Sequence, residues 1–214
     1  ALDVATCDEP VTIVEHETTS FSIILSGGSG ERVILYAPGT NIHMHDALFD
    51  RSATAKADWV ILNHIQEQAT VIQDDLIDIL QSSAIQCTWN PGGCFTRCEN
   101  ITQAMQNLLA CGVQCGCVTD GKNGCTATDG TALYHCPVCP DTTVVDTTGA
   151  GDAFTTGMTW ALMMGNDLPT ALKAGTINGG SVVGIIGAQD GLLTDNEMRR
   201  RLNLQHIDVS VQSL

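Results

Sequence analysis

The chain has 214 residues, of which 43% are hydrophobic, and its 24 acidic residues against 9 Lys and Arg give a formal net charge of −15. Because phosphate binding needs a basic face, this acidity argues against nucleic acid or an anionic membrane as a partner. No apolar run approaches the roughly 18 residues of a membrane span, so we expect a soluble, cytoplasmic protein with a substantial core.

Three strands are predicted near the start of the chain, at residues 11–14, 21–25 and 32–36, from their apolar and β-branched composition. The loop Ser26-Gly27-Gly28-Ser29-Gly30 joins the last two. Because no helix pattern follows this loop, a hairpin turn is favoured over a phosphate-binding loop. The chain begins at Ala1 without a methionine, so we expect that its true start is missing or was removed.

Strands and helices then alternate along the chain. Residues 70–82 are predicted as an amphipathic helix, with Val71, Leu76, Ile79 and Leu80 facing inward. Further predicted elements are a short helix at 42–55, a buried strand at 58–64, a strand at 85–89, a helix at 101–111, a strand at 113–119, a hairpin of 125–127 and 132–135 around Asp129-Gly130, a helix from 169 that Asn178-Gly179-Gly180 loosens, and a short, basic, solvated helix at 197–202.

Cysteine is frequent, with ten residues in the chain. Nothing in the sequence indicates secretion, so reduced thiols are expected. Cys136-Pro137-Val138-Cys139 has the C-x-x-C spacing of zinc and redox sites. Cys115 and Cys117, in contrast, alternate within a strand-like run, as small buried side chains do. A metal or redox role and a buried structural role both stay open.

A glycine turn stands between the two C-terminal helix patterns and the strands before them. Val144 and Val145 predict a strand, small residues with Gly149 and Gly151 predict a turn, and the apolar spacing from Phe154 onward predicts a helix. At such a junction the unpaired N–H groups of the first helical turn and the positive end of the helix dipole favour an anion. The two glycines let the backbone approach that anion closely.

Asp152 is the unexpected residue in this turn. A carboxylate at a helix start repels a bound phosphate, unless it takes the proton from a hydroxyl that attacks the phosphate, as a kinase requires. The alternative is an aspartate that only caps or stabilises the first turn of the helix.

The string Asp146-Thr147-Thr148-Gly149-Ala150-Gly151-Asp152-Ala153-Phe154, followed by Thr155-Thr156-Gly157, closely resembles the C-terminal signature of the ribokinase-like (PfkB) carbohydrate kinases. The resemblance is strong over residues 118–193 and looser before them. It implies a three-layer α/β fold with a mainly parallel sheet flanked by helices. It also implies a single domain over residues 1–214, incomplete at its N-terminus, with remnants of a small β lid at about residues 10–36.

The resemblance further implies an ATP-dependent kinase that transfers the γ-phosphoryl group to a primary hydroxyl of a small sugar substrate. Asp152 would be the general base, and Gly149, Ala150 and Gly151 would form the anion hole. Mg²⁺ is expected with ATP, and K⁺ near Asp146 and Thr148. Family members often dimerise through the lid, so a homodimer is a further expectation. The nucleotide contacts implied are Asn90, Thr119, Gly121, Gly124 and Asn178, and the sugar contacts are Asn41, His64 and Asp152, with a structural role for His64 left open.

Three parts of the family pattern have no match in this chain. They are the N-terminal strand with a substrate-binding aspartate, the glycine-glycine-asparagine motif, and the Asn-x-x-Glu motif that helps to place magnesium. Residues 94–100 pass almost directly into the next helix, where that last motif is expected. A non-catalytic remnant that binds nucleotide or a partner chain is therefore the alternative to a kinase. A cysteine-rich metal-binding protein on a kinase-like scaffold is a third hypothesis.

Overall fold

The computed structural model describes residues 15–26, 32–43, 51–63, 70–83, 85–90, 101–110, 112–140 and 142–214. The chain divides into two compact units, which we call the N-terminal unit (residues 3–92) and the C-terminal unit (residues 93–214). In the ranges given above, no helix combines the length and the apolar character that crossing a bilayer requires. The expectation of one domain over the whole chain stays a prediction, and each unit is described by itself.

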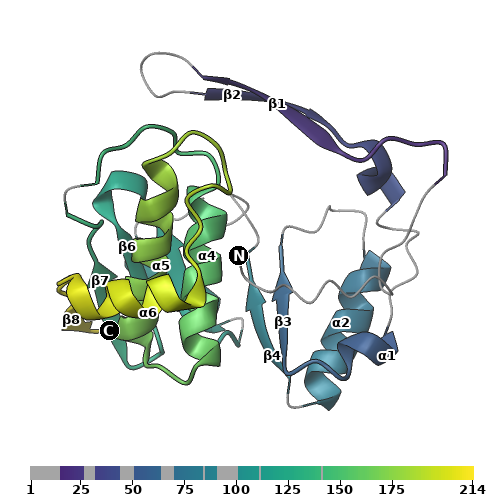
Figure 1. The fold of residues 1–214 in the computed structure, drawn as a ribbon. Coiled ribbons are helices and arrows are strands. Elements are labelled where there is room, and N and C mark those ends of the chain that lie inside the picture. The colour runs from purple at the N-terminus through teal and green to yellow at the C-terminus, as the bar shows by residue number, and fades with distance from the viewer. Residues whose placement is uncertain are drawn as a thin grey trace. The chain divides into compact units, whose positions relative to one another are not determined.

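A two-stranded ribbon opens the N-terminal unit (Figure 1). Strands β1 (Phe21–Ser26) and β2 (Arg32–Ala37) are antiparallel, with Phe21 opposite Ala37, so the predicted hairpin is confirmed. A single 3₁₀ turn, η1 (Gly39–His43), follows. Gly39 has a φ of +47°, and a Cβ there would lie 2.3 Å from the carbonyl oxygen of Thr18. The close approach of these two backbone segments therefore requires glycine. The strand predicted at 11–14 lies outside the described residues.

The N-terminal unit continues with a β-α-β arrangement. Strands β3 (Trp59–Leu62) and β4 (Gln86–Trp89) are parallel, and α2 (Thr70–Ser82) connects them, with the bounds that the sequence predicts. Leu76 and Ile79 of α2 are buried as expected, because they fall on one face of the helix. The side chain of Val71 lies outside the described residues.

One prediction for this unit needs correction, and a second is tested only in part. The strand β3 is only partly buried, since half of the Ile61 side chain is exposed. The helix predicted at 42–55 is described at its two ends, as η1 and as the short α1 (Arg51–Thr54), whose Arg51 pairs with Asp75 of α2. Residues 44–50 between them lie outside the described residues.

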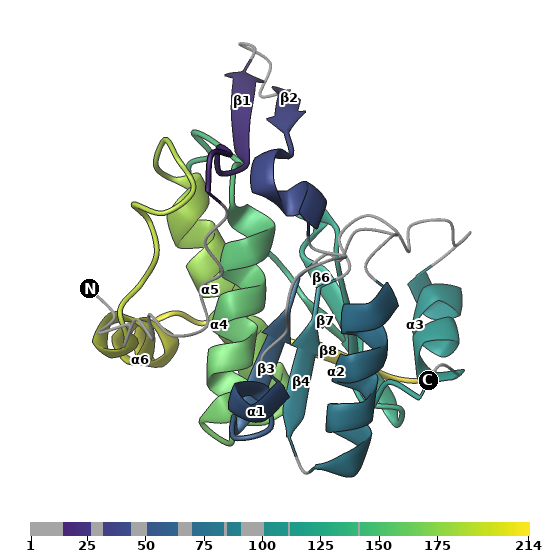
Figure 2. The same ribbon diagram turned by 90° about the vertical axis from the view of Figure 1, so that its right-hand side faces the viewer.

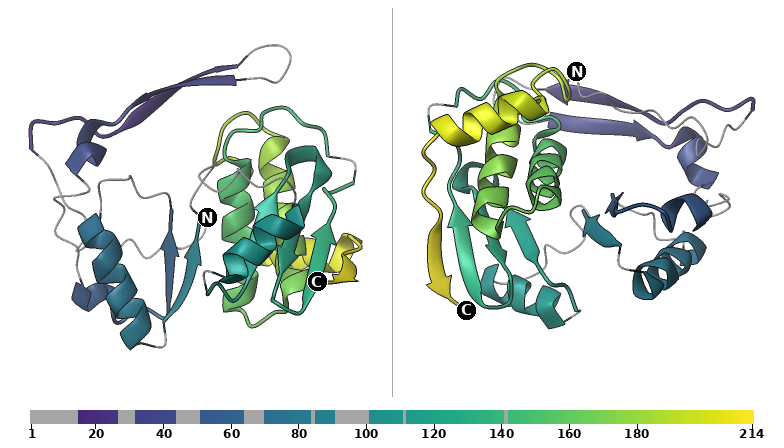
Figure 3. Two further views of the ribbon diagram at one scale, coloured as in Figure 1. Left: turned by 180° about the vertical axis from the view of Figure 1, so that it is seen from behind. Right: turned by 60° about the horizontal axis from the view of Figure 1, so that its bottom comes forward.

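The C-terminal unit is built on a four-stranded sheet of order β5-β6-β7-β8, in which every neighbouring pair is antiparallel. The predicted hairpin is present as β6 and β7. The sequence also predicts a mainly parallel sheet, and among the described strands β3 and β4 form the one parallel pair. Strand β8 lies at the edge of the sheet beside β7, far from it in sequence (Figure 3). The sheet consists of β5 (Gly116–Thr119), β6 (Cys125–Thr128), β7 (Ala132–Cys136) and β8 (Ser210–Ser213).

Helices cover both faces of this sheet (Figure 2). On one face lies α3 (Ile101–Ala110), where a Cβ on Gly116 would lie 3.1 Å from the side chain of Leu108. On the other face, α5 (Leu168–Val183) packs on β7, with α4 (Ala150–Met163) and α6 (Asp195–Leu204) beside it. The period-two alternation of the strands separates these two faces. The core residues shared by sheet and helices include Cys125, Ala127, Cys136, Cys139, Phe154, Ala161, Leu172, Ala174, Ile177 and Met198.

Glycines bring α4 and α5 into close contact. A Cβ on Gly157 would lie 2.7 Å from the carbonyl oxygen of Ala174, and one on Gly175 would lie 2.9 Å from that of Phe154. The prediction that Asn178-Gly179-Gly180 loosens α5 is wrong, because the helix continues to Val183. Packing against α4 overrides the low helix propensity of these residues. The helix predicted at 197–202 is also longer, and its Met198 is buried rather than solvated.

Candidate active site

The glycine turn leads directly into α4. Gly149 is the N-cap residue with a φ of +77°, and a Cβ there would lie 2.8 Å from the Cβ of Ala188. Both facts require glycine at this position. The strand predicted at Val144 and Val145 is absent from the structure. The amides of Val145 and Asp146 instead donate to the carbonyl oxygen of Val183, at 2.8 and 3.2 Å, so the end of α5 takes the place of a partner strand.

The first turn of α4 presents backbone amides to solvent. The amide of Ala150 donates to Thr147 O at 3.3 Å and that of Ala153 to Gly149 O at 2.9 Å. The amides of Gly151 and Asp152 lie between them, in the part of a helix that has no intrahelical acceptor. Gly151 is exposed, and a Cβ there would meet no atom within 4 Å. The geometry therefore offers an accessible, positively polarised helix end that suits an anion.

Asp152 is exposed in this first turn. Its backbone carbonyl accepts a hydrogen bond from Thr156 Oγ1 at 2.8 Å, whereas its carboxylate has no hydrogen-bonding partner among the described residues. The Asp152 side chain does not cap the helix, because the N-cap is Gly149 and, among the described residues, no amide of the turn donates to the carboxylate. Its place in the first turn does fit the alternative that its charge stabilises the helix start. Chemically, the group is free to accept a proton from an approaching hydroxyl.

Asp146, near which the sequence predicts a K⁺ site, contacts two separate segments of the C-terminal unit. Its Oδ1 accepts hydrogen bonds from the amide of Thr148 at 2.9 Å and from the Thr148 hydroxyl at 2.8 Å. Its Oδ2 accepts from the amide of Gly187 at 3.1 Å. The carboxylate thus holds the turn before α4 against the segment after α5. We call residues 184–192 the α5–α6 segment.

Asn178 lies in the middle of α5 and is only 3% exposed. Its Nδ2 donates to Ala153 O at 2.8 Å, and its Oδ1 accepts from the amide of Leu193 at 3.1 Å. Both polar ends of this predicted nucleotide contact are therefore engaged within the protein.

The turn from Thr119 to Gly124 lies at the end of β5 and contains the 3₁₀ turn η3 (Gly121–Asn123). Thr119 and Gly121 are exposed. The amide of Asp120 donates to Gly124 O at 2.8 Å, which closes the turn. Gly124 has a φ of +87°, and a Cβ there would lie 2.2 Å from the carbonyl oxygen of Cys136. Glycine at 124 is thus required by the fold, and a nucleotide contact by this turn stays a prediction.

The remaining predicted site residues belong to the N-terminal unit. Asn41 donates from Nδ2 to the Tyr36 hydroxyl at 2.9 Å, and the amide of Asn90 donates to Leu62 O at 2.8 Å. His64 lies outside the described residues. The roles of Asn41, His64 and Asn90 stay predictions, whereas the predicted residues from 146 to 152 and Asn178 are brought together in the C-terminal unit.

The described cysteines are free thiols, and several are buried. A hydrogen bond with the Cys117 thiol is the main cause that raises the pKa of Cys125 to about 12. Burial raises the pKa of Cys139 to about 11, and the thiol of this residue donates to Thr176 O at 3.6 Å. In the described part of the chain, no three His, Cys, Asp or Glu side chains are grouped to hold a metal. These thiols act as core side chains of the C-terminal unit.

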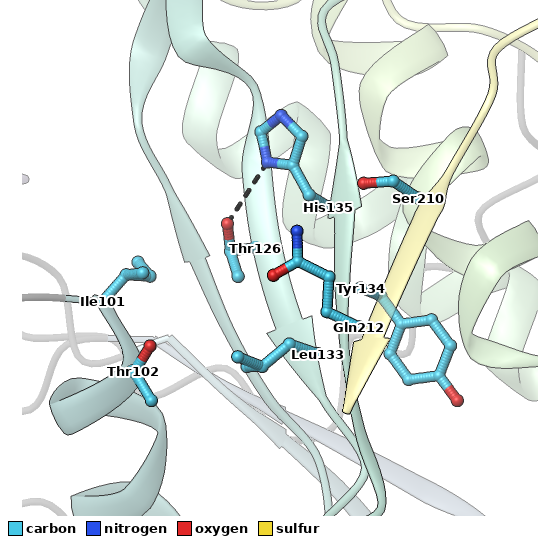
Figure 4. Close-up of a pocket in the computed structure, with 8 residues that line it drawn as sticks. All are labelled: Ile101, Thr102, Thr126, Leu133, Tyr134, His135, Ser210 and Gln212. Carbon is cyan, nitrogen blue, oxygen red and sulfur yellow. Dashed lines mark hydrogen bonds between the residues drawn. The ribbon is translucent and has the colours of Figure 1, made fainter. Parts of the chain in front are cut away.

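A pocket lies on the α3 face of the sheet (Figure 4). Its volume is about 210 Å³, and Thr126 Oγ1 and His135 Nδ1 lie 3.3 Å apart in its wall. Ligand pockets for drug-sized molecules usually measure about 300–1,000 Å³. Because the strands of the sheet separate this pocket from α4 and α5, it is not part of the glycine-turn site. The residues that line it are Ile101, Thr102, Thr126, Leu133, Tyr134, His135, Ser210 and Gln212.

Sequence reasoning missed how the α5–α6 segment takes part in the site. It did not predict that the amide of Gly187 binds Asp146 or that Ala188 lies against Gly149. The signal was present in the small residues Gly187 and Ala188, which permit close backbone approach. Their partners, Asp146 for Gly187 at 41 positions and Gly149 for Ala188 at 39 positions, could not be identified from spacing alone.

Comparison with known proteins gives the same family as the resemblance seen in the sequence. Residues 86–195, just over half of the chain, match the family described as pfkB family carbohydrate kinase. The chain is 28% identical to ribokinase of Bacillus subtilis (strain 168) over 214 residues, which cover 91% of this chain and 71% of the relative. It is 37% identical to fructoselysine 6-kinase of Escherichia coli (strain K12) over 78 residues, which cover 36% of this chain and 30% of the relative.

Solved structures share the fold. The nucleoside kinase of Burkholderia thailandensis in complex with inosine has a TM-score of 0.73 at 17% identity, with 89% of this chain and 70% of that chain covered. The ribokinase of Thermotoga maritima has a TM-score of 0.72 at 20% identity, with 87% and 70% covered. The ribokinase of Cryptococcus neoformans in complex with ADP has a TM-score of 0.70 at 21% identity, with 88% and 73% covered. The α/β fold class expected from the sequence is thereby confirmed, and the chain belongs to the pfkB family of carbohydrate kinases.

Proposed function

We propose that this protein transfers the γ-phosphoryl group of ATP to a primary hydroxyl of a carbohydrate, with Asp152 as the general base. The observation that carries the proposal is the start of α4, where an exposed carboxylate lies beside helix amides, and neither has a hydrogen-bonding partner among the described residues. Family membership and the match to ribokinase and fructoselysine 6-kinase support a sugar as the acceptor.

The proposed reaction needs a proton acceptor and a stabiliser of negative charge. The Asp152 carboxylate takes the proton of the attacking hydroxyl, and the oxygen attacks the γ-phosphorus as the bond from that phosphorus to the β–γ bridging oxygen breaks and ADP leaves. The amides of Gly149, Gly151 and Asp152 donate to the oxygens of the phosphoryl group, where charge is redistributed in the transition state, whereas the amide of Ala150 is already bonded to Thr147 O. A general base contributes roughly 10²–10⁴-fold to the rate of such a step.

The described residues differ in how well they suit the two expected cations. Asp146 and Thr148 place carboxylate and hydroxyl oxygens together, a donor set that suits K⁺. For Mg²⁺ the described residues offer no group of three acidic, His or Cys side chains. The phosphates of ATP and water would therefore supply most of the ligands of Mg²⁺. Bound Mg²⁺ would neutralise charge on the transferring group.

The test is the Asp152→Asn variant of the complete protein, assayed with ATP against a panel of pentoses, hexoses and nucleosides. We expect turnover to fall by about 10²–10⁴-fold on the best substrate, because the amide cannot accept the proton. ATP should bind as well or better by calorimetry, since a negative charge near the phosphates is removed. Asp208→Asn is the matched control, because it removes the same charge from another exposed position of the C-terminal unit.

Turnover by Asp152→Asn within a few-fold of that of the unmodified protein would show that the base lies elsewhere. An unmodified protein that binds ATP and phosphorylates none of the panel would instead favour the non-catalytic remnant, for which the missing family motifs speak.

A further inference from the structure

Asn178 is a buried amide whose two hydrogen bonds reach different parts of the candidate site. Buried side-chain amides are normally fully hydrogen-bonded, because an unpaired polar atom away from water is costly. Here Nδ2 donates to Ala153 O and Oδ1 accepts from the amide of Leu193. Only 3% of the residue is exposed, so little of the side chain is accessible to a ligand.

The first of these bonds fixes the start of α4. Ala153 follows Asp152 directly, and its amide is bonded to the N-cap residue Gly149. The backbone of α5 supports the same turn, because a Cβ on Gly179 would lie 3.3 Å from Ala150 O. The first turn of α4 is thus held by a side-chain bond and by close backbone packing from one helix.

The second bond fixes the end of the α5–α6 segment. Leu193, whose amide donates this bond, follows the α5–α6 segment directly. The middle of the segment is already held to the glycine turn by the hydrogen bond from the Gly187 amide to Asp146. Its beginning is tied as well, because Val183 O accepts from Val145 and Asp146. One side chain in α5 therefore connects the helix that carries Asp152 with the segment that lies against Gly149.

We propose that Asn178 is a positioning residue, which holds Asp152 and the amides of the glycine turn in register with the α5–α6 segment and does not touch the nucleotide. The proposal rests on the proposed function, in which Asp152 is the base. Its physical basis is the sensitivity of catalysis to geometry, since a displacement of about 1 Å can cost about 10²-fold in rate.

Two substitutions separate the two bonds. In Asn178→Asp the remaining acceptor oxygen can still bind the Leu193 amide, but a carboxylate cannot donate to Ala153 O. In Asn178→Ala both bonds are lost. Ile177→Val is the matched control, because Ile177 is the adjacent buried residue of α5 and its shortening weakens the core without touching either bond.

In the complete protein we expect kcat to fall by about 10–10²-fold in both Asn178 variants, with KM for ATP unchanged within about threefold. Ile177→Val should keep kcat within about twofold at a temperature where every variant is folded. A normal kcat in Asn178→Ala, or a raised KM for ATP with unchanged kcat, would overturn the proposal, the latter by assigning Asn178 to nucleotide contact.

Hydrogen exchange followed by mass spectrometry tests the same idea without turnover. Exchange over residues 149–158 should be faster in both Asn178 variants, and exchange over residues 184–193 should be faster in Asn178→Ala. Ile177→Val should change neither segment. Unchanged exchange in both Asn178 variants would refute the positioning role, whereas full activity of Asp152→Asn would refute the proposed function and leave the exchange result intact.

Discussion

Gly149→Ala is the substitution whose effect can be worked out most directly from the structure. The residue has a φ of +77°, and the left-handed conformation costs a non-glycine residue roughly 1–2 kcal/mol. The new methyl carbon would lie 2.8 Å from Ala188 Cβ and 2.9 Å from Ala188 O, so backbone must move. Overpacking of this kind costs roughly 1–3 kcal/mol, which brings the sum to about 2–5 kcal/mol.

Gly151→Ala is the matched control, because the same methyl group is added two residues later, inside the helix and in open space. Alanine stabilises a helix over glycine by up to about 1 kcal/mol. Thermal unfolding followed by circular dichroism should therefore show Gly149→Ala with a midpoint about 4–20 °C below that of the unmodified protein, at about 2–4 °C per kcal/mol. Gly151→Ala should unfold at the same temperature or slightly above. Equal midpoints for the two variants would refute the conformational argument.

Three further predictions concern the cation, the thiols and acid stability. K⁺ should tighten ATP binding in calorimetric titrations, and Asp146→Asn should remove the dependence; equal affinity in K⁺ and in a large organic cation would contradict the assignment. The pKa of the buried Cys125 is raised chiefly by its hydrogen bond with Cys117, and that of the buried Cys136 chiefly by its hydrogen bond with Cys125 and by burial. Both thiols should therefore alkylate slowly in native protein at pH 8 and fully once denatured without reductant; unmodified thiols or stoichiometric zinc would count against this. Hydrogen bonds from Arg200 and Arg201 lower the pKa of Glu197 from 4.5 to about 2, so its stabilising contribution is complete above pH 4.5 and is lost as the pH falls toward 2. Acid unfolding of Glu197→Gln should accordingly be less steep across that window, and identical curves would exclude the effect.

The local sequence pattern was sufficient to predict the elements with strong periodicity. The bounds of α2 follow from its apolar spacing, and the hairpin of β6 and β7 follows from Asp129-Gly130 between two strand patterns. Asp129 stabilises that turn by accepting from the amide and hydroxyl of Thr131, which is the usual role of aspartate at a turn. The glycine turn with Asp152 was located by its residue types, because few other residues fit a left-handed N-cap and an accessible helix start.

Tertiary contacts determine the conformation of the segments that the local sequence pattern predicted wrongly or missed. Val144 and Val145 have the composition of a strand, yet their backbone bonds to the end of α5, which no local signal indicates. Asn178-Gly179-Gly180 predicts a break, yet close packing on α4 keeps these residues helical. The strand β8 was missed because Ser210-Val211-Gln212-Ser213 has weak apolar alternation and is exposed throughout. Its partner β7 precedes it by more than seventy residues, so its pairing was beyond any sequence window.

The separation of β7 and β8 also determines the order in which the sheet can be completed during synthesis. His135 pairs with Ser210 and Ala132 with Ser213, so residues 137–209, including all three helices from α4 to α6, are made before that edge can be covered. Until then β7 is an open edge strand, and such edges can pair with other chains. The nascent protein therefore carries an exposed strand while the helices of its C-terminal unit are already able to form, and late closure by β8 removes that hazard.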